Sequence, residues 1–256
     1  MGERMMQNAA LKIVEEPQTM TNTEVGRIDV ENAAVTFKGP KGKKIEALAP
    51  TDLVIDPGSF VSLIGPSGCG KSTLLKGVAG YMAPVEGTMK LNGREITEPG
   101  PDRVMVFQEF DQLLPWKTVK QNITFALLNG KKCASRAEAD DVAMEYIKKV
   151  KLERFEDTYP HMLSGGMKQK LGLCCALIHD PEILVLDEPT TGVDPLSRQQ
   201  FWQLIEHIRQ SQTCMTVLVA TAYMDEAARF DHLVAMNDGK ILATGPADEI
   251  LSRTGT

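Results

Sequence analysis

Short apolar runs alternate along this chain with longer segments in which apolar residues recur every three or four positions. The first pattern is typical of buried strands and the second of amphipathic helices. Alternation of the two indicates an α/β core with a mainly parallel sheet covered on both faces. The predicted strands are residues 28–37, 59–64, 103–107, 183–187 and 215–221, with helices at residues 71–81 and from Pro195, and a hairpin of residues 233–236 and 240–243.

Residues 111–160 interrupt this alternation with a helical pattern. Ser135-Arg136-Ala137-Glu138 is a capping-box sequence, and Ala143, Ile147 and Val150 follow on one helix face. We therefore expect a helical lobe inserted into the core. Residues 1–25 have no apolar h-region, so we expect a flexible extension and not a signal peptide, followed by one domain of residues 26–256.

A glycine-rich loop follows the second predicted strand. Gly65-Pro66-Ser67-Gly68-Cys69-Gly70-Lys71-Ser72 matches the phosphate-binding pattern G-x-x-x-x-G-K-[ST], between a strand and a helix as that motif requires. Backbone N–H groups and the positive end of the following helix suit a phosphate, and the glycines leave room for it. Lys71 is predicted to bridge the β- and γ-phosphates and Ser72 to bind Mg²⁺. Cys69 is predicted to be a small loop residue.

Two carboxylates end the predicted strand at residues 183–187. Asp187 is suited to hold Mg²⁺ through water, which leaves Glu188 free to polarise an attacking water. Alone, such a pair is also typical of a solvated strand end. Beside a phosphate-binding loop, it predicts hydrolysis of ATP.

Leu163-Ser164-Gly165-Gly166-Met167 lies shortly before that strand. With Gln108 after its own strand and Asp194 past Glu188, it closely resembles the ATP-binding subunits of ABC transporters, over about residues 28–251. The sequence L-S-G-G alone is also compatible with an ordinary helix N-terminus. The resemblance implies a phosphate-loop NTPase core with a mainly parallel sheet, an antiparallel β portion near the N-terminus and the inserted helical lobe.

The resemblance also implies that two subunits stack head to tail around ATP. Ser164, Gly165 and Gly166 of one subunit would then contact the ATP held by the other subunit's phosphate loop. It assigns catalysis to Glu188, Lys71 and Gln108, and Mg²⁺ to Ser72, Gln108 and Asp187. The nucleotide contacts that it implies are Phe37, Gly65, Pro66, Ser67, Gly68, Cys69, Gly70, Lys71, Ser72, Thr73, Ser164, Gly165, Gly166 and Asp194.

Two further roles implied by the resemblance have a plain alternative. Phe37 would stack on adenine, or it is a core residue at a strand end. Leu113-Leu114-Pro115-Trp116 resembles the surface where importer subunits receive a coupling helix, although Trp116 could equally belong to the core of the lobe.

Ala222 stands where the family normally has a switch histidine that contacts the γ-phosphate. Three alternatives remain: a one-residue slip, a contact from another loop, or the Tyr223 hydroxyl, although neighbouring side chains on a strand point to opposite faces. We expect intact ATP binding and dimerisation with slow basal hydrolysis.

The composition narrows the class further. With 43% hydrophobic and 24% charged residues the chain is typical of a soluble globular protein, and its net charge of −6 argues against a dedicated nucleic-acid binder. No run approaches the roughly 18 to 20 apolar residues that span a bilayer. The five cysteines Cys69, Cys133, Cys174, Cys175 and Cys214 lack C-x-x-C spacing, so we expect neither a disulfide framework nor a zinc site. This use of cysteine favours a protein of the reducing cytoplasm.

The two halves of the chain resemble different branches of the family. Gly100-Pro101-Asp102-Arg103 and residues 113–116 resemble nitrate, sulfonate and taurine importers, whereas residues 190–198 and 221–227 are closer to exporter and multidrug-type ATPases.

We interpret the chain as the ATPase subunit of an importer of small anions at the cytoplasmic face of the membrane. The implied partners are a second copy, transmembrane permease subunits and a substrate-binding protein, with no nucleic acid. The alternatives are an exporter subunit, or a soluble ABC ATPase that acts on a macromolecule such as the ribosome. Soluble members usually carry two cassettes, and this chain has one.

Overall fold

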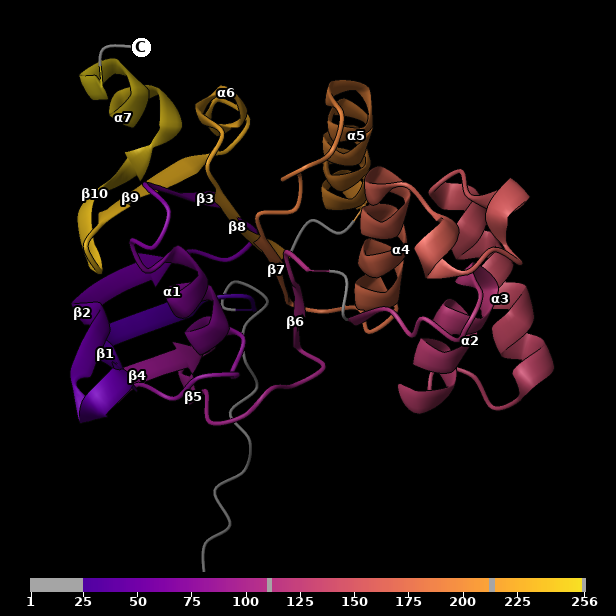
Figure 1. Ribbon diagram of the computed structural model, residues 1–256, viewed down its shortest axis with the longest axis horizontal. Coiled ribbons are helices and arrows are strands. Elements are labelled where there is room, and N and C mark those ends of the chain that lie inside the picture. The colour runs from indigo at the N-terminus through magenta and orange to yellow at the C-terminus, as the bar shows by residue number, and fades with distance from the viewer. Residues whose placement is uncertain (1–24, 110–111, 212–214, 255–256) are drawn as a thin grey trace, which may run out of the picture.

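The computed structural model describes residues 25–109, 112–211 and 215–254. The predicted N-terminal extension, apart from residue 25, and Cys214 lie outside the described residues. Within them, two sheets and the helices that pack on them are joined to a separate helical region at the right of Figure 1. This arrangement confirms the predicted fold class, including the antiparallel portion near the N-terminus.

The larger sheet has six strands in the order β10-β9-β3-β8-β7-β6. Five of them run parallel, and β10 pairs antiparallel with β9 at one edge, as the predicted hairpin requires. The strands are β3 (Phe60–Ile64), β6 (Arg103–Val106), β7 (Ile183–Asp187), β8 (Thr216–Thr221), β9 (His232–Asn237) and β10 (Lys240–Pro246).

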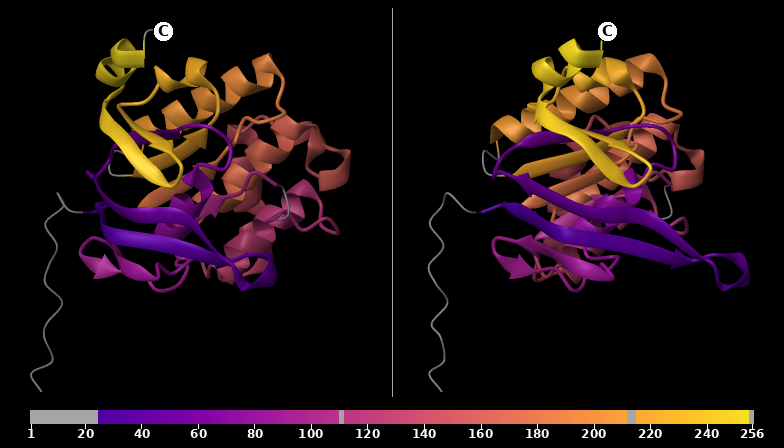
Figure 2. Two further views of the ribbon diagram at one scale, coloured as in Figure 1. Left: turned by 60° about the vertical axis from the view of Figure 1, so that its left-hand side comes forward. Right: turned by 90° about the vertical axis from the view of Figure 1, so that its left-hand side faces the viewer.

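The smaller sheet is antiparallel, with the order β2-β1-β4-β5. Its strands are β1 (Ile28–Lys38), β2 (Lys44–Ile55), β4 (Glu86–Leu91) and β5 (Arg94–Glu95). A 3₁₀ turn, η1 (Pro40–Gly42), joins β1 to β2, and their hairpin projects from the body of the molecule (Figure 2).

Helices cover both faces of the six-stranded sheet, because its strands carry apolar side chains on both faces. In β7, Ile183 and Val185 face the core that contains α1 (Lys71–Val78), whereas Leu184 and Leu186 face the core that contains α5 (Pro195–Ser211). The first core also holds the buried face of the antiparallel sheet. The second also contains residues of α4 (Gly165–Leu177) and α7 (Ala247–Thr254).

A third apolar core belongs to the helical region at the right of Figure 1. It joins α2 (Val119–Asn129), α3 (Arg136–Lys149) and one face of α4. The Ser135 hydroxyl accepts from the N–H of Glu138 as predicted, but the Glu138 carboxylate accepts from Ala134. The reciprocal capping box is instead formed by Thr118 and Gln121 at the start of α2. Two short 3₁₀ helices, η3 (Glu153–Phe155) and η4 (Pro160–Met162), complete this part of the chain, and α6 (Met224–Ala227) lies between β8 and β9.

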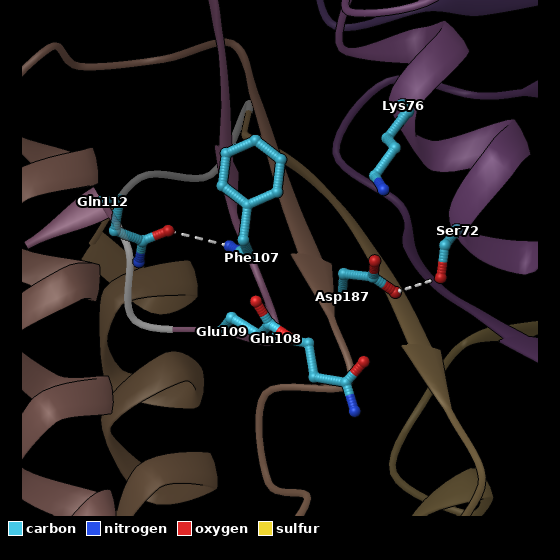
Figure 3. A pocket seen from close by; sticks show the side chains of 7 residues that line it. All are labelled: Ser72, Lys76, Phe107, Gln108, Glu109, Gln112 and Asp187. Carbon is cyan, nitrogen blue, oxygen red and sulfur yellow. Dashed lines mark hydrogen bonds between the residues drawn. The ribbon is translucent and has the colours of Figure 1, made fainter.

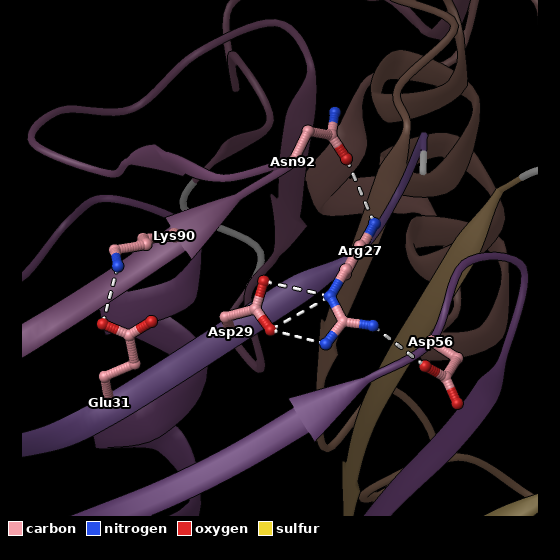
Figure 4. A network of polar contacts seen from close by, with 6 residues as sticks. All are labelled: Arg27, Asp29, Glu31, Asp56, Lys90 and Asn92. Carbon is pink, nitrogen blue, oxygen red and sulfur yellow. Dashed lines mark hydrogen bonds and ion pairs between the residues drawn. The ribbon is translucent and has the colours of Figure 1, made fainter. Parts of the chain in front are cut away.

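Charged residues at the start of β1 form a surface network (Figure 4). The Arg27 guanidinium contacts Asp29 at 2.9 Å and Asp56 at 3.3 Å, and Lys90 pairs with Glu31 across β4 and β1 at 2.6 Å. Exposed ion pairs of this kind each contribute about 0–1 kcal/mol, so the two apolar cores that flank the sheets dominate stability. Among the described residues, no helix combines the length and apolar character needed to cross a membrane.

Candidate active site

The glycine-rich loop connects β3 to α1 in a conformation that only glycine adopts easily. Gly65 and Gly70 have φ of +150° and +103°, and a Cβ on Gly65 would collide with the carbonyl oxygen of Met236. Gly70 is the N-cap of α1 and offers no side chain to its first N–H groups. Those groups therefore remain available for an anion.

The Lys71 side chain folds back over this loop. Its Nζ donates to the carbonyl oxygens of Gly65 at 2.8 Å and Pro66 at 3.0 Å, and the residue is only 4% exposed. Cys69 is buried, with its Sγ 3.9 Å from Lys71 Nζ. The lysine is thus held by neutral acceptors at the loop, where a phosphate oxygen would offer a stronger, charged partner.

Ser72 and Asp187 bring two distant segments together. The Ser72 hydroxyl, in the first turn of α1, donates to Asp187 Oδ1 at 2.8 Å, at the end of β7 (Figure 3). Burial raises the pKa of Asp187, and the hydrogen bond from Ser72 opposes that shift. Thr73 follows on the same turn and is half-buried.

Glu188 begins the loop after β7 in a left-handed conformation, with φ of +46°. Its Oε2 accepts hydrogen bonds from Gln108 Nε2 at 3.2 Å and from the Thr191 hydroxyl at 3.1 Å. The contact with Gln108 follows from topology, because β6 and β7 are parallel neighbours and both residues lie just past their carboxyl ends. The structure therefore brings together five predicted site residues at the carboxyl ends of the parallel strands: Lys71, Ser72, Gln108, Asp187 and Glu188.

A cavity of about 580 Å³ opens beside these residues (Figure 3). It is lined by Ser72, Gln108 and Asp187, and also by four residues that the sequence analysis missed: Lys76, Phe107, Glu109 and Gln112. Lys76 was detectable in principle, because it lies four residues after Ser72 and so on the same face of α1. Gln112 had no such signal: its Oε1 reaches back to accept from the N–H of Phe107 at 2.9 Å.

The segment Ser164–Gly166 lies apart from the phosphate loop. Ser164 is the exposed N-cap of α4, and its hydroxyl accepts from Met167 N–H at 3.4 Å. Gly166 is packed so that a Cβ would lie 2.7 Å from Ser197 Cβ. Since α1 and α4 pack on opposite faces of the sheet, one chain does not bring the two segments together.

Asp194 caps α5, as the sequence predicts. Its Oδ1 accepts from Ser197 N–H at 3.0 Å, and hydrogen bonds from Ser197 lower the pKa of Asp194. Phe37 lies near the end of β1 opposite Ile45 and is 39% exposed, so it is not a core residue. Trp116 is 69% exposed, whereas Leu113 is buried in the core of the lobe.

Ala222 is exposed directly after β8. The Tyr223 ring packs against Arg198, whose Cζ lies 3.9 Å from the ring centroid. The four histidines of the chain lie elsewhere: His161 in η4, His179 after α4, His207 in α5 and His232 at the start of β9.

These features are those of a phosphate-loop ATPase. A family model described as "ABC transporter" matches residues 48–191. The chain belongs to the ABC transporter family and is one of its ATPases, which confirms the resemblance inferred from the motifs.

Known relatives agree with this assignment. The chain is 41% identical to the nitrate import ATP-binding protein NrtC of Synechococcus elongatus, over 86% of this chain but only 32% of that protein. It is 36% identical to the nitrate import ATP-binding protein NrtD of the same organism, over 91% of this chain and 85% of NrtD. The chain thus spans about a third of the length of NrtC and most of NrtD.

The fold is also similar to that of a solved cassette. The dimeric structure of a post-hydrolysis state of the ATP-binding cassette MJ0796, bound to ADP and Pi, has a TM-score of 0.78 at 28% identity. The match covers 86% of this chain and 98% of that one.

Proposed function

We propose that this chain hydrolyses ATP to energise a membrane importer of small inorganic anions. The observation that carries the proposal is the 36–41% identity to nitrate import ATP-binding proteins over 86–91% of the chain. Bicarbonate transport ATP-binding proteins are similarly related, with 40% identity for one from Synechocystis. Both anions are small and carry one negative charge, so the proposal extends to this chemical class and not to one substrate.

In this proposal, the loop from Gly65 to Thr73 wraps the phosphates of ATP. Lys71 exchanges its two carbonyl acceptors for phosphate oxygens, which are charged and therefore better partners. Phe37 provides the adenine platform at the projecting hairpin, where its exposed ring is free to stack. Glu188 then accepts a proton from the attacking water, while Gln108 orients the carboxylate.

The residues beside Ser72 also fit a magnesium ion. The hydroxyl of Ser72 and the carboxylate of Asp187 are oxygen donors that meet at 2.8 Å, next to a cavity with the Gln108 amide on its wall. Magnesium prefers a few such oxygens together with phosphate oxygens and water. When bound, the ion would neutralise charge on the β- and γ-phosphates.

A homodimer completes the site in this proposal. The N–H groups at the start of α4 would not reach a phosphate held by the loop of their own chain, because α4 lies on the opposite side of the sheet from α1. Ser164, Gly165, Gly166 and Asp194 would therefore serve ATP bound to a second copy. The dimeric state of the cassette MJ0796 supports this arrangement.

The implied partner in the membrane is a permease dimer, reached through the lobe, with a substrate-binding protein on the other side. The exposed Trp116 beside the buried Leu113 provides a docking position on the lobe. The chain would then lie on the cytoplasmic face of the membrane as a peripheral subunit.

Purification of the tagged full-length chain from detergent-solubilised membranes of its source tests this assignment. We expect a polytopic membrane protein to co-purify at equal stoichiometry. The Trp116→Glu variant should no longer co-purify with it, whereas Leu242→Glu, which changes a similarly exposed residue on β10, should still do so. In proteoliposomes with the binding protein, nitrate or bicarbonate should stimulate hydrolysis. A ribosome-bound chain, or stimulation only by apolar drugs, would contradict the importer assignment.

A further inference from the structure

One buried carboxylate lies just outside the proposed ATP site. Glu226, on α6, is 2% exposed and accepts three short hydrogen bonds. Its Oε1 accepts from the hydroxyl of Thr190 and the indole N–H of Trp202, both at 2.8 Å, and its Oε2 accepts from the hydroxyl of Thr221 at 2.8 Å. A buried charge requires such partners, since leaving it unpaired is strongly unfavourable.

Two of these donors border the site, one in a loop and one at the end of a strand. Thr190 lies two residues after Glu188, in a turn closed by the Thr191 N–H, which donates to the Glu188 carbonyl oxygen at 3.1 Å. Thr221 ends β8 immediately before Ala222 and also accepts from the N–H of Tyr223 at 3.0 Å. A single carboxylate therefore connects the loop that carries Glu188 with the loop that carries Ala222.

Glu188 needs such support, because its left-handed backbone is unfavourable for a residue with a Cβ. Its own N–H donates to the Ala220 carbonyl at 2.9 Å, which fixes its backbone to β8. The Thr190–Glu226–Thr221 bridge fixes the next turn to the end of the same strand. Ala222 has no polar side chain with which to hold a nucleophilic water, so alignment depends more heavily on Glu188.

We propose that Glu226 is a positioning residue for hydrolysis, which acts through Thr190 and Thr221 to hold the Glu188 carboxylate in line with the attacking water. This inference rests on the proposed role of Glu188. Charge-assisted hydrogen bonds in a buried site are strong and directional, as this role requires. A bridge that served only the fold would stabilise the protein without favouring the hydrolytic step.

The test is to break each half of the bridge by an isosteric substitution and to measure kcat, KM and the melting temperature. Thr190→Val and Thr221→Val should each lower kcat by at least tenfold. The upper bound is about 10²-fold, the loss that a misplacement of 1 Å produces. KM for ATP should stay nearly constant. Thr190→Ser keeps the hydroxyl and should restore kcat. The double variant should be no slower than the slower single variant, because both changes break one bridge.

Thr124→Val is the matched control. Thr124 is a buried threonine in the lobe, 3% exposed, that also donates one side-chain hydrogen bond to a carboxylate, Asp140 at 2.7 Å. It should lower the melting temperature as much as the bridge variants but leave kcat unchanged. Equal kcat in Thr190→Val and wild type would overturn the inference, as would additive losses in the double variant. Glu188→Gln in the same assay separates the two proposals: if it too hydrolyses normally, the role of Glu188 itself is wrong.

Discussion

Gln108 Nε2 donates to Glu188 Oε2 at 3.2 Å, although 80 residues separate them along the chain. The bond joins the loops that follow β6 and β7, so the proposed general base is in direct contact with Gln108, one of the proposed magnesium ligands. Thr191 supports the same carboxylate oxygen at 3.1 Å. Two side chains of the fold therefore orient the Glu188 carboxylate.

Glu188→Gln should trap an ATP-bound dimer. The amide keeps the shape and an acceptor oxygen for Gln108, but it no longer accepts a proton from water, which should slow hydrolysis by about 10²–10⁴-fold. Size-exclusion chromatography of the variant with ATP and Mg²⁺ should show a dimer, and with ADP a monomer. Glu145→Gln, on the exposed side of α3, is the control. A monomer at every protein concentration would argue against the ATP-bridged dimer.

Lys71→Ala should abolish ATP binding. The lysine is buried at the loop and offers the only charge-assisted donor among the loop residues Gly65 to Ser72, so its loss removes attraction where solvent screens weakly. Isothermal titration with ATP and Mg²⁺ measures the loss directly. Lys90→Ala removes a surface lysine that pairs with Glu31 and should bind as wild type does. Wild-type affinity in Lys71→Ala would place the phosphates elsewhere.

Phe37→Ala should weaken nucleotide binding by roughly 1–2 kcal/mol, the energy of one base–aromatic stack. The hydrolysis rate at saturating ATP should change little, because the platform is far from the γ-phosphate in this assignment. Ile45→Ala removes its cross-strand neighbour, which is 47% exposed, and controls for damage to the hairpin. Equal losses in both variants would indicate a hairpin effect and not stacking.

The strands and the phosphate loop could be predicted because each has a local cause. Apolar residues of β7 are buried on both faces, and Gly65 and Gly70 occupy positions that exclude a Cβ. The start of α5 at Pro195 was predictable for the same reason, since Asp194 caps it through Ser197.

The polar connections between segments could not be predicted in this way. The hydrogen bond that the Thr190 hydroxyl donates to Glu226 joins residues that are 36 positions apart, and their proximity depends on the paths of whole loops. The exposure of Trp116 likewise depends on how the lobe helices pack, since an apolar residue in a helical lobe is equally compatible with core and surface. Residues of this kind become visible only when the strand order is known.

Ala222→His should raise kcat with little change in affinity for ATP. Ala222 is exposed directly after β8, the strand next to the one that ends in Asp187, so an imidazole there has room to extend toward the γ-phosphate. One added transition-state hydrogen bond is worth about 10²-fold in rate. Single-turnover hydrolysis at saturating ATP measures the gain. Tyr223→Phe is the companion variant: its ring packs against Arg198, so loss of the hydroxyl should leave kcat unchanged. If Tyr223→Phe lowers kcat instead, and Ala222→His has no effect, the tyrosine hydroxyl replaces the histidine and Ala222 does not limit the rate.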